Sequence, residues 1–285
     1  MLLFEIFFQG MTKISVVIPT LNSECTLGST ILSLVSQRNV DVKVIVVDSG
    51  SEDSTLDICH RWQIQVLYAE PGNIYRAINA GLSKLDTEWL AYINSDDWLY
   101  PNSLFRLTNY GQRLEADVVY GNCDFVDEEG RFVYSFASAH PKQLLSLFQA
   151  GVFGFAQQGA IFRRSLYESL SGFDETYQLI ADADFYFRAL KKNVKFARLQ
   201  DPSVACFRIH ENQLSNCREQ EMQAENFRLR PQTDIITSVQ AWTTLTQWRF
   251  SNLPHYMLRL FRQSLLSNKL KVTSSMKAYD HLTHR

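Results

Sequence analysis

Two adjacent carboxylates, Asp96 and Asp97, follow directly after an apolar run at positions 89–93. They complete the sequence Asn94-Ser95-Asp96-Asp97. Hard oxygen ligands of this kind suit Mg²⁺ or Mn²⁺, which usually take one or two carboxylates together with substrate phosphates. The competing interpretation is a turn, or an N-cap ahead of a following helix. The cluster by itself indicates a candidate cation site and leaves that alternative open.

Polar residues also follow two earlier apolar runs. ISVVI at 14–18 and VKVIVV at 42–47 are predicted to be buried strands. The first run ends at Pro19, and the polar residues behind the two runs are Thr20, Asn22, Asp48 and Ser51. Ligands bind at the carboxyl ends of the strands in open α/β sheets. Each such residue could be only a turn former, but three clusters at one sheet edge favour a binding site.

The elements that must position these clusters alternate along the chain. A helical stripe, Leu27, Ile31 and Leu34, separates the first two strands. A third strand is predicted at 64–68, a helix at 73–85 and a fourth strand at 89–93. The predicted later elements are strands at 118–120, 123–126, 131–134, 159–162, 194–197 and 204–207, helices from about 165 and at 182–190, and helices beyond about 216. Strands alternating with helices predict an α/β fold with a mainly parallel sheet.

Three familiar nucleotide-binding motifs are missing from the sequence. No G-x-G-x-x-G follows the first strand, which argues against a Rossmann dehydrogenase, and no G-x-x-x-x-G-K-[ST] occurs. The first strand leads into Pro19-Thr20-Leu21-Asn22 rather than into a glycine-rich phosphate loop. This exclusion also counts against a sugar-1-phosphate nucleotidyltransferase.

The ordered set of segments resembles the family-2 glycosyltransferases, which are inverting enzymes of the GT-A fold. The resemblance runs from Ile14 to Ser215. The segments that carry it are SVVIPTLN (15–22), VIVVDSGSEDST (44–55), EPGNIYRAINAGL (70–82) with YINSDDWLYP (92–101), QGAIFRRSLYESLSGFDETY (158–177) with IADADFYFRAL (180–190), and RIHENQLS (208–215). The segment at 92–101 resembles the branch of the family whose D-x-D-like motif has the form N-S-D-D.

The resemblance implies roles for individual residues. It makes Asp182 the catalytic base, with Asp184 two residues on as the alternative, and it implies an acceptor region that includes Gln158 and Asp184. Asp96, Asp97 and His210 are the implied ligands of Mn²⁺ or Mg²⁺. The implied donor-binding residues are Pro19, Thr20, Asn22, Asp48, Ser51, Asn79, Asn94, Ser95, Asp96 and His210. His210 could instead be structural, as a lone histidine usually is.

Two positions depart from the family pattern. Asn94 stands where the common D-x-D form begins with Asp, although an amide can still bind a ribose hydroxyl. Ala181 stands where the family often has Glu before the base. The remaining carboxylates still match the chemistry of sugar transfer. A cation is needed on the leaving diphosphate, and a carboxylate must accept the proton of the acceptor hydroxyl.

The expected reaction is transfer of a sugar from a nucleoside-diphosphate sugar to a hydroxyl of a saccharide or lipid-linked acceptor, in polysaccharide or glycolipid assembly. Two other classes of function stay open: a non-catalytic sugar-nucleotide-binding protein and a membrane-docked assembly protein. The formal net charge of −2 gives no sign of nucleic-acid binding.

The C-terminal part of the chain is basic and rich in apolar residues. Residues 228–285 carry nine Lys or Arg and two acidic residues, whereas the rest of the chain is acidic. Residues 241–268 mix aromatic and leucine side chains with arginines. The aromatic and leucine residues are Trp242, Trp248, Phe250, Leu253, Tyr256, Leu258, Leu260, Phe261 and Leu265, and the arginines are Arg249, Arg259 and Arg262. Such a helix can lie on a membrane surface, pack on the catalytic domain or pack on a second subunit of a homo-oligomer.

The expected domain organisation has three parts. Residues 1–11 are an N-terminal extension or a remnant of expression, 12–215 form the GT-A domain with halves at 12–100 and 101–215, and 216–285 are a helical extension. Five widely spaced cysteines without a C-x-x-C pair predict free thiols, and positions 1–10 make a poor signal peptide. The expected location is therefore the cytoplasm, with contact at the inner face of the membrane left open.

Overall fold

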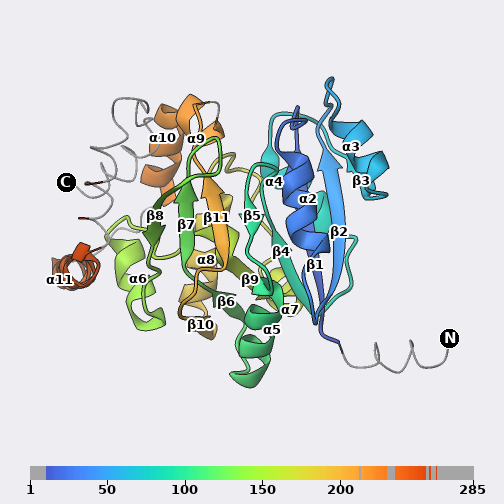
Figure 1. Ribbon diagram of the computed structural model, residues 1–285. Helices are drawn as coiled ribbons and strands as arrows, with labels where there is room; N and C mark the ends of the chain where they lie inside the picture. The colour runs from blue at the N-terminus through green and yellow to red at the C-terminus, as the bar shows by residue number, and fades with distance from the viewer. Residues whose placement is uncertain (1–10, 212, 230–234, 255–256, 258–260, 262–285) are drawn as a thin grey trace.

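A computed structural model describes residues 11–211, 213–229, 235–254, 257 and 261 (Figure 1). Its first half contains β1 (Lys13–Thr20), α2 (Leu27–Val35), β2 (Asp41–Asp48), α3 (Thr55–Arg61), β3 (Gln65–Tyr68), α4 (Ile74–Leu82), β4 (Trp89–Tyr92), β5 (Trp98–Leu99) and α5 (Ser103–Arg113). The second half contains β6 (Val118–Tyr120), β7 (Cys123–Val126), β8 (Phe132–Phe136), α6 (Pro141–Gln149), η1 (Gln157–Gly159), β9 (Ala160–Arg163), α7 (Arg164–Ser169), α8 (Ala181–Lys191), β10 (Phe196–Arg198), β11 (Ala205–Arg208), α9 (Leu214–Cys217), α10 (Glu219–Leu229) and α11 (Ile235–Ser251).

The main sheet has seven strands in the order β10-β6-β9-β4-β1-β2-β3. β1 pairs in parallel with β2 and β4, and β2 pairs in parallel with β3. β9 is the antiparallel member, between β4 and β6. The predicted α/β architecture with a mainly parallel sheet is therefore confirmed.

Both faces of this sheet are buried, which explains why its strands read as continuous apolar runs. Val17 of β1 belongs to the core cluster that contains α4 residues, including Ile78. Its neighbours Val16 and Ile18 belong to the opposite cluster, together with Leu27 of α2. Because successive side chains of a strand alternate between faces, one strand supplies both cores and holds α2 and α4 on opposite sides.

A second sheet of four strands has the order β5-β11-β7-β8 and lies beside the main sheet (Figure 1). The sequence pattern did not predict β5 or α6, and it indicated α5 only as the helix of the N-cap alternative for Asp96 and Asp97. β5 is only two residues long, too short to show a period. α6 begins at Pro141 after an N-cap on His140, whose Nδ1 accepts the amide of Lys142 at 3.2 Å while Gln143 accepts the amide of His140. Histidine is not among the usual N-cap residues, so the only familiar start signal here was the proline at the first helical position.

The C-terminal helix α11 packs beside α6 (Figure 1). Ala241, Leu245 and Trp248 are buried on its inner face, and the Trp248 ring lies 5.9 Å from that of Phe136 in β8. Packing on the catalytic body therefore accounts for this face. Trp242, on the outer side, stays 52% exposed.

Several predicted features of the tail, among them Tyr256, Leu258, Arg259, Leu260, Arg262 and Leu265, lie outside the described residues, as do positions 1–10. None of the described helices is long and apolar enough to cross a membrane. All five cysteines are free thiols, as their spacing predicted.

Helix α4 approaches β1 and β2 closely because it has a glycine at position 81. A Cβ at Gly81 would lie 2.7 Å from a methyl of Val17 and 2.9 Å from a methyl of Val47. We expect Gly81→Ala to destabilise the fold by about 1–3 kcal/mol, because overpacking a filled core forces strain. A shift of the urea midpoint at unchanged m-value measures this effect.

Gly28→Ala is the matched control, because nothing lies within 4 Å of a Cβ at Gly28 in α2. It should leave the midpoint unchanged or raise it, since Ala is the better helix former by up to about 1 kcal/mol. Equal effects of the two variants would contradict the close packing of α4.

Candidate active site

Loops that follow β1, β2 and β4 meet at one edge of the main sheet. The amide of Asn22 donates to Ser51 Oγ at 2.9 Å, and the amide of Glu52 donates back to Asn22 Oδ1 at 2.9 Å. Ser23 Oγ lies 2.7 Å from Ser95 Oγ, which joins the first loop to the third. The three polar clusters therefore converge, as parallel strand order requires.

Asp48 closes the end of β2 with its side chain turned into the protein. It is 1% exposed, and one carboxylate oxygen accepts the amides of Gly50 and Ser51 at 2.9 and 3.0 Å. The other oxygen accepts from the hydroxyls of Ser51 and Thr20. Four donors fix the shape of the loop, and Ser49 of the same loop reaches the cleft described below.

Asp96 and His210 come together although 114 residues separate them. Asp96 Oδ2 lies 2.8 Å from His210 Nε2, and both side chains are about one-fifth exposed. A carboxylate oxygen and an imidazole nitrogen in contact at the mouth of these loops form a donor pair suited to a divalent cation or a phosphate.

Asp97 is fully buried directly behind Asp96. Its Oδ1 accepts the amide of Arg208 at 2.9 Å, and its other oxygen lies 3.5 Å from Asn94 Nδ2. Burial raises the pKa of Asp97 well above its usual range, and the charge of Asp96 adds to this rise. Hydrogen bonds from Arg208 and Gln158 oppose it. Asp97 therefore serves the attachment of β11 rather than facing the cleft.

One continuous cleft of about 1760 Å³ runs from these loops across the face of the protein. The predicted site residues that line it are Pro19, Thr20, Asn22, Asn94, Ser95, Asp96, Gln158, Asp182 and His210. The predicted residues outside its lining are Asp48, Ser51, Asn79, Asp97 and Asp184.

Asp182 lines this cleft from the first turn of α8. The Tyr75 hydroxyl donates to Asp182 Oδ1 at 2.8 Å, and Tyr75 itself is 4% exposed. Burial raises the pKa of Asp182, while hydrogen bonds from Tyr75 and from the amide of Ala183 lower it. The result is a partly desolvated carboxylate held in one orientation, which is what a general base requires.

Asp184 faces away from Asp182. It accepts a hydrogen bond from Arg188 Nε at 2.6 Å, and Arg188 also donates to the carbonyls of Leu170 and Gly172. Positions i and i+2 of a helix point in different directions, so only one of the two aspartates can face the cleft. Asp182 therefore lies in the cleft, whereas Asp184 holds Arg188 against the backbone that connects α7 with α8.

Asn79 makes four hydrogen bonds to the segment that leads into α8. Its Nδ2 donates to the Phe173 carbonyl at 2.8 Å and to Glu175, and its Oδ1 accepts from the Tyr167 hydroxyl and the Phe173 amide. The side chain is fully used in fastening this segment to α4. The neighbouring Arg76 lies 3.6 Å from Glu175, on the same outer side.

Besides Ser49, residues at the site that were not predicted include Tyr75, Tyr92 and Arg208. Tyr75 and Tyr92 line the cleft near Asp182, and burial raises the pKa of both phenols well above the usual value. Arg208 Nε donates to the Asp96 carbonyl at 3.0 Å. Arg208 stands in the R-x-H segment and could have been singled out, but nothing in the sequence connects Tyr75 with Asp182.

Among the described residues, no three His, Cys, Asp or Glu side chains cluster closely enough to hold a metal by themselves. Mn²⁺ and Mg²⁺ sites of sugar-nucleotide chemistry do not need such a cage, because phosphates and water complete the shell. Asp96 and His210 therefore fit a cation that arrives with a diphosphate.

The comparisons with known proteins agree with this architecture. The model of the family "Glycosyl transferase family 2" matches residues 15–171. A PGL/p-HBAD biosynthesis glycosyltransferase of Mycobacterium bovis is 27% identical over 201 residues, which cover 68% of this chain and 75% of that protein.

Two solved structures share the fold at low sequence identity. The Staphylococcus aureus TarS fragment 1–349 in complex with UDP has a TM-score of 0.59 at 18% identity, covering 93% of this chain and 78% of that one. The mannosyltransferase PcManGT of Pyrobaculum calidifontis, in complex with GDP-Man and Mn²⁺, has a TM-score of 0.59 at 15% identity, covering 95% and 78%. Since the family model spans more than half of the 285 residues, the chain belongs to glycosyl transferase family 2.

Proposed function

We propose that this glycosyltransferase is a metal-dependent, inverting enzyme that moves a sugar from a nucleoside-diphosphate donor to a hydroxyl acceptor in polysaccharide or glycolipid assembly. One observation carries the proposal. The Asp96–His210 pair and the desolvated carboxylate of Asp182 line the same continuous cleft. A protein that only binds sugar nucleotides would have no use for a buried carboxylate beyond the donor loops.

The donor end of the cleft fits a nucleoside diphosphate. Thr20, Asn22 and Ser49 line it where the loops after β1 and β2 meet. Asp96 and His210 would hold Mn²⁺ or Mg²⁺ against the diphosphate, and the cation would neutralise charge on the leaving group. The bound UDP of TarS and the GDP-Man with Mn²⁺ of PcManGT support this class of donor. The sequence Asn94-Ser95-Asp96-Asp97 supports assignment to the N-S-D-D branch.

The reaction requires one displacement at the anomeric carbon. The acceptor oxygen forms the new bond while the bond from that carbon to the diphosphate oxygen breaks, and the electron pair leaves with the diphosphate. Asp182 takes the proton of the acceptor hydroxyl. Attack from the face opposite the leaving group inverts the anomeric configuration.

Three residues that the sequence placed at the site have other tasks in this proposal. Asp97 and Asn79 are engaged by protein groups behind the cleft, and Asp184 is paired with Arg188. We therefore assign cation contact to Asp96 and His210, and base chemistry to Asp182. Gln158 lines the cleft and keeps its proposed acceptor-side role.

Domain organisation and location are part of the same proposal. A GT-A domain at 12–215 followed by a helical extension at 216–285 agrees with the change from sheet to helix after β11. Cytoplasmic action, with contact at the inner face of the membrane through the C-terminal helices, would suit a lipid-linked acceptor. A homo-oligomer remains a further expectation.

The cation assignment predicts the behaviour of Asp96→Ala. This variant should lose Mn²⁺-dependent binding of UDP or GDP and at least about a hundredfold of turnover, because charge on the leaving diphosphate is no longer compensated. A thermal-shift screen checks binding directly, since a ligand at 100 times its Kd adds about 2.7 kcal/mol of apparent stability.

Asp41→Ala is the matched control, because Asp41 is an exposed carboxylate at the opposite end of β2. Its nucleotide-dependent shift should equal that of the wild type. Wild-type turnover that EDTA leaves undiminished would overturn the metal assignment.

The base assignment predicts that Asp182→Asn binds donor normally but loses sugar transfer by roughly 10²-fold or more. Asp184→Asn makes the same chemical change two residues on. It should reduce thermal stability through loss of the Arg188 pair and largely retain transfer. An inactive Asp184→Asn beside an active Asp182→Asn would show that the wrong carboxylate has been assigned.

The hydrogen bond from Tyr75 predicts a pH effect. It lowers the pKa of Asp182, so Tyr75→Phe should raise that pKa. Since the base acts as the carboxylate and activity falls as pH falls through its pKa, the acid limb of the kcat profile should move to higher pH. The rate at the acid end should drop by about tenfold, the effect of one hydrogen bond to a charged group. A uniform loss at every pH would indicate a structural role only.

A further inference from the structure

The lining of the cleft differs between the elements that contribute to it. The loops after β1 and β4 contribute mainly polar residues, whereas α6, α10 and α11 contribute apolar and aromatic side chains together with Gln223 and Asn226 of α10, and α8 contributes the small side chain of Ala183 next to Asp182. The apolar and aromatic residues of this lining include Val152, Phe153, Met222, Leu245 and Trp242. At about 1760 Å³ the cleft is larger than the roughly 300–1,000 Å³ of a usual small-molecule site, so a second ligand has room.

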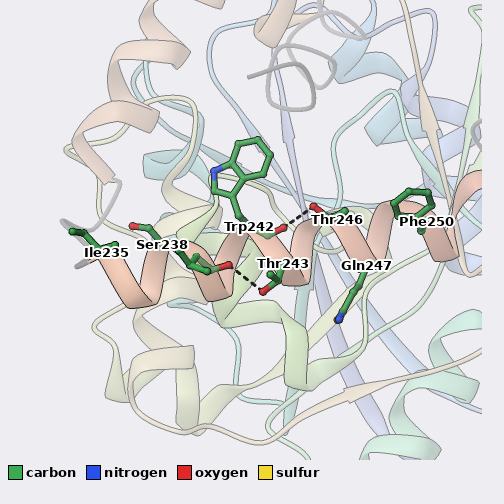
Figure 2. A pocket seen from close by; sticks show the side chains of 8 residues that line it. Ile235, Ser238, Trp242, Thr243, Thr246, Gln247 and Phe250 are labelled. Atoms are coloured by element: carbon green, nitrogen blue, oxygen red, sulfur yellow. Dashed lines mark hydrogen bonds between the residues drawn. The ribbon is translucent and has the colours of Figure 1, made fainter.

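Trp242 is the point at which this cleft meets a second hollow. Its side chain lines the cleft of the catalytic residues and also a shallower hollow of about 580 Å³ along the outer face of α11. Figure 2 shows its ring projecting from α11 on the side opposite to Gln247. Trp242 thus connects the surroundings of Asp182 with the outside of α11.

The outer face of α11 continues the apolar lining as a stripe. Ile235, Val239, Trp242, Thr246 and Phe250 follow one another at helical spacing and all line the second hollow (Figure 2). At 1.5 Å per residue the stripe is about 22 Å long.

The threonines on this face expose methyl groups rather than unpaired hydroxyls. Thr246 Oγ1 donates to the Trp242 carbonyl at 2.8 Å, and Thr243 Oγ1 donates to the Val239 carbonyl at 3.0 Å (Figure 2). Such bonds to carbonyls three or four residues back satisfy the hydroxyl within the helix. Neither threonine hydroxyl therefore needs a polar partner from a ligand, and Ser238 and Gln247 are the other polar residues that line the hollow.

The helix is also fixed in place, so the stripe is a rigid surface. Leu245 and Trp248 are buried at 1% and 4% exposure on the opposite side, against α6 and Phe136. The apolar side chains of the inner face are buried by this packing, whereas Val239 and Phe250 on the outer face remain 58% and 71% exposed.

We propose that the acceptor of this enzyme carries a long apolar chain, which runs from Asp182 past Trp242 and along the outer stripe of α11. This inference rests on the proposed function, because it names the acceptor class of the same cleft. A free saccharide has no use for an apolar path of this length, and a single aromatic ring would not extend beyond Trp242. An alkyl or isoprenyl chain matches both the length of the stripe and its mainly apolar surface.

The test compares alkyl glycosides that share one sugar. Methyl, phenyl and octyl β-D-glucoside are titrated into the full chain with UDP and Mn²⁺, below the micelle concentration of the octyl compound. We expect octyl glucoside to bind at least about tenfold more tightly than methyl glucoside, which requires burial of only two or so CH₂ groups. Phenyl glucoside should lie between them.

Trp242→Ser should weaken octyl binding by at least about fivefold and leave methyl binding and the UDP-dependent thermal shift unchanged. Val239→Ser, one turn earlier on the stripe, should weaken octyl binding to a lesser extent. Trp62→Ser is the matched control, since Trp62 is an exposed tryptophan after α3, away from the cleft lining.

Three results would overturn the proposal. These are octyl glucoside binding no better than methyl glucoside, phenyl glucoside binding as tightly as octyl, and a wild-type dimer whose dissociation by Trp242→Ser leaves octyl binding intact. The last result would assign the stripe to a second copy of the chain. Failure of the wild type to bind UDP or GDP with Mn²⁺ would count against the proposed function, while the comparison of glycosides would still report on the apolar path.

Discussion

A buried carboxylate joins the two ends of the donor site. Asp97 accepts the amide of Arg208 across a separation of 111 residues, and the adjacent β5 pairs with β11 through Trp98 and Cys206. These contacts fix where β11 ends, and His210 follows two residues later. Asp96 and His210 can meet because Asp97 has already aligned the segments that carry them. The two adjacent aspartates therefore differ in position: Asp97 is buried in the protein, and Asp96 faces the cleft.

The position of Asp182 also depends on a contact between distant parts of the chain. Tyr75 reaches from α4 to Asp182 across 107 residues, and α4 is itself seated against β1 and β2 through Gly81. The phenol offsets part of the desolvation that raises the pKa of Asp182. A carboxylate in an apolar wall would otherwise remain protonated over more of the pH range and lose its value as a base. The proximity of α4 to the sheet therefore helps to position Tyr75 against Asp182, the proposed base.

The sequence predicted the parts of this arrangement that depend on local pattern. Apolar runs located β1, β2 and β4, and their parallel order brought Thr20, Asn22 and Asn94 to one edge. Two kinds of feature could not be predicted from local sequence pattern. β5 is too short to show periodicity, and the His140 cap of α6 lacks the usual residue type. Choosing between Asp182 and Asp184 was possible only by resemblance, since the physical distinction lies in their partners Tyr75 and Arg188, which no local pattern connects to them.

The same reasoning explains why the site belongs to neither half of the chain alone. Asp96 and Tyr75 come from the first hundred residues, whereas Asp182 and His210 come from the segments after β9. The main sheet crosses this division because β9 pairs with β4, so both halves share one set of backbone hydrogen bonds. Three contacts, Asp97 to Arg208, Asp96 to His210 and Tyr75 to Asp182, each span more than one hundred residues. Any separation of the halves would part Asp96 from His210, the proposed cation ligands, and would break the contact between Tyr75 and Asp182, the proposed base. The shared sheet therefore holds together both groups of residues to which we assign roles, and residues from both halves line the cleft.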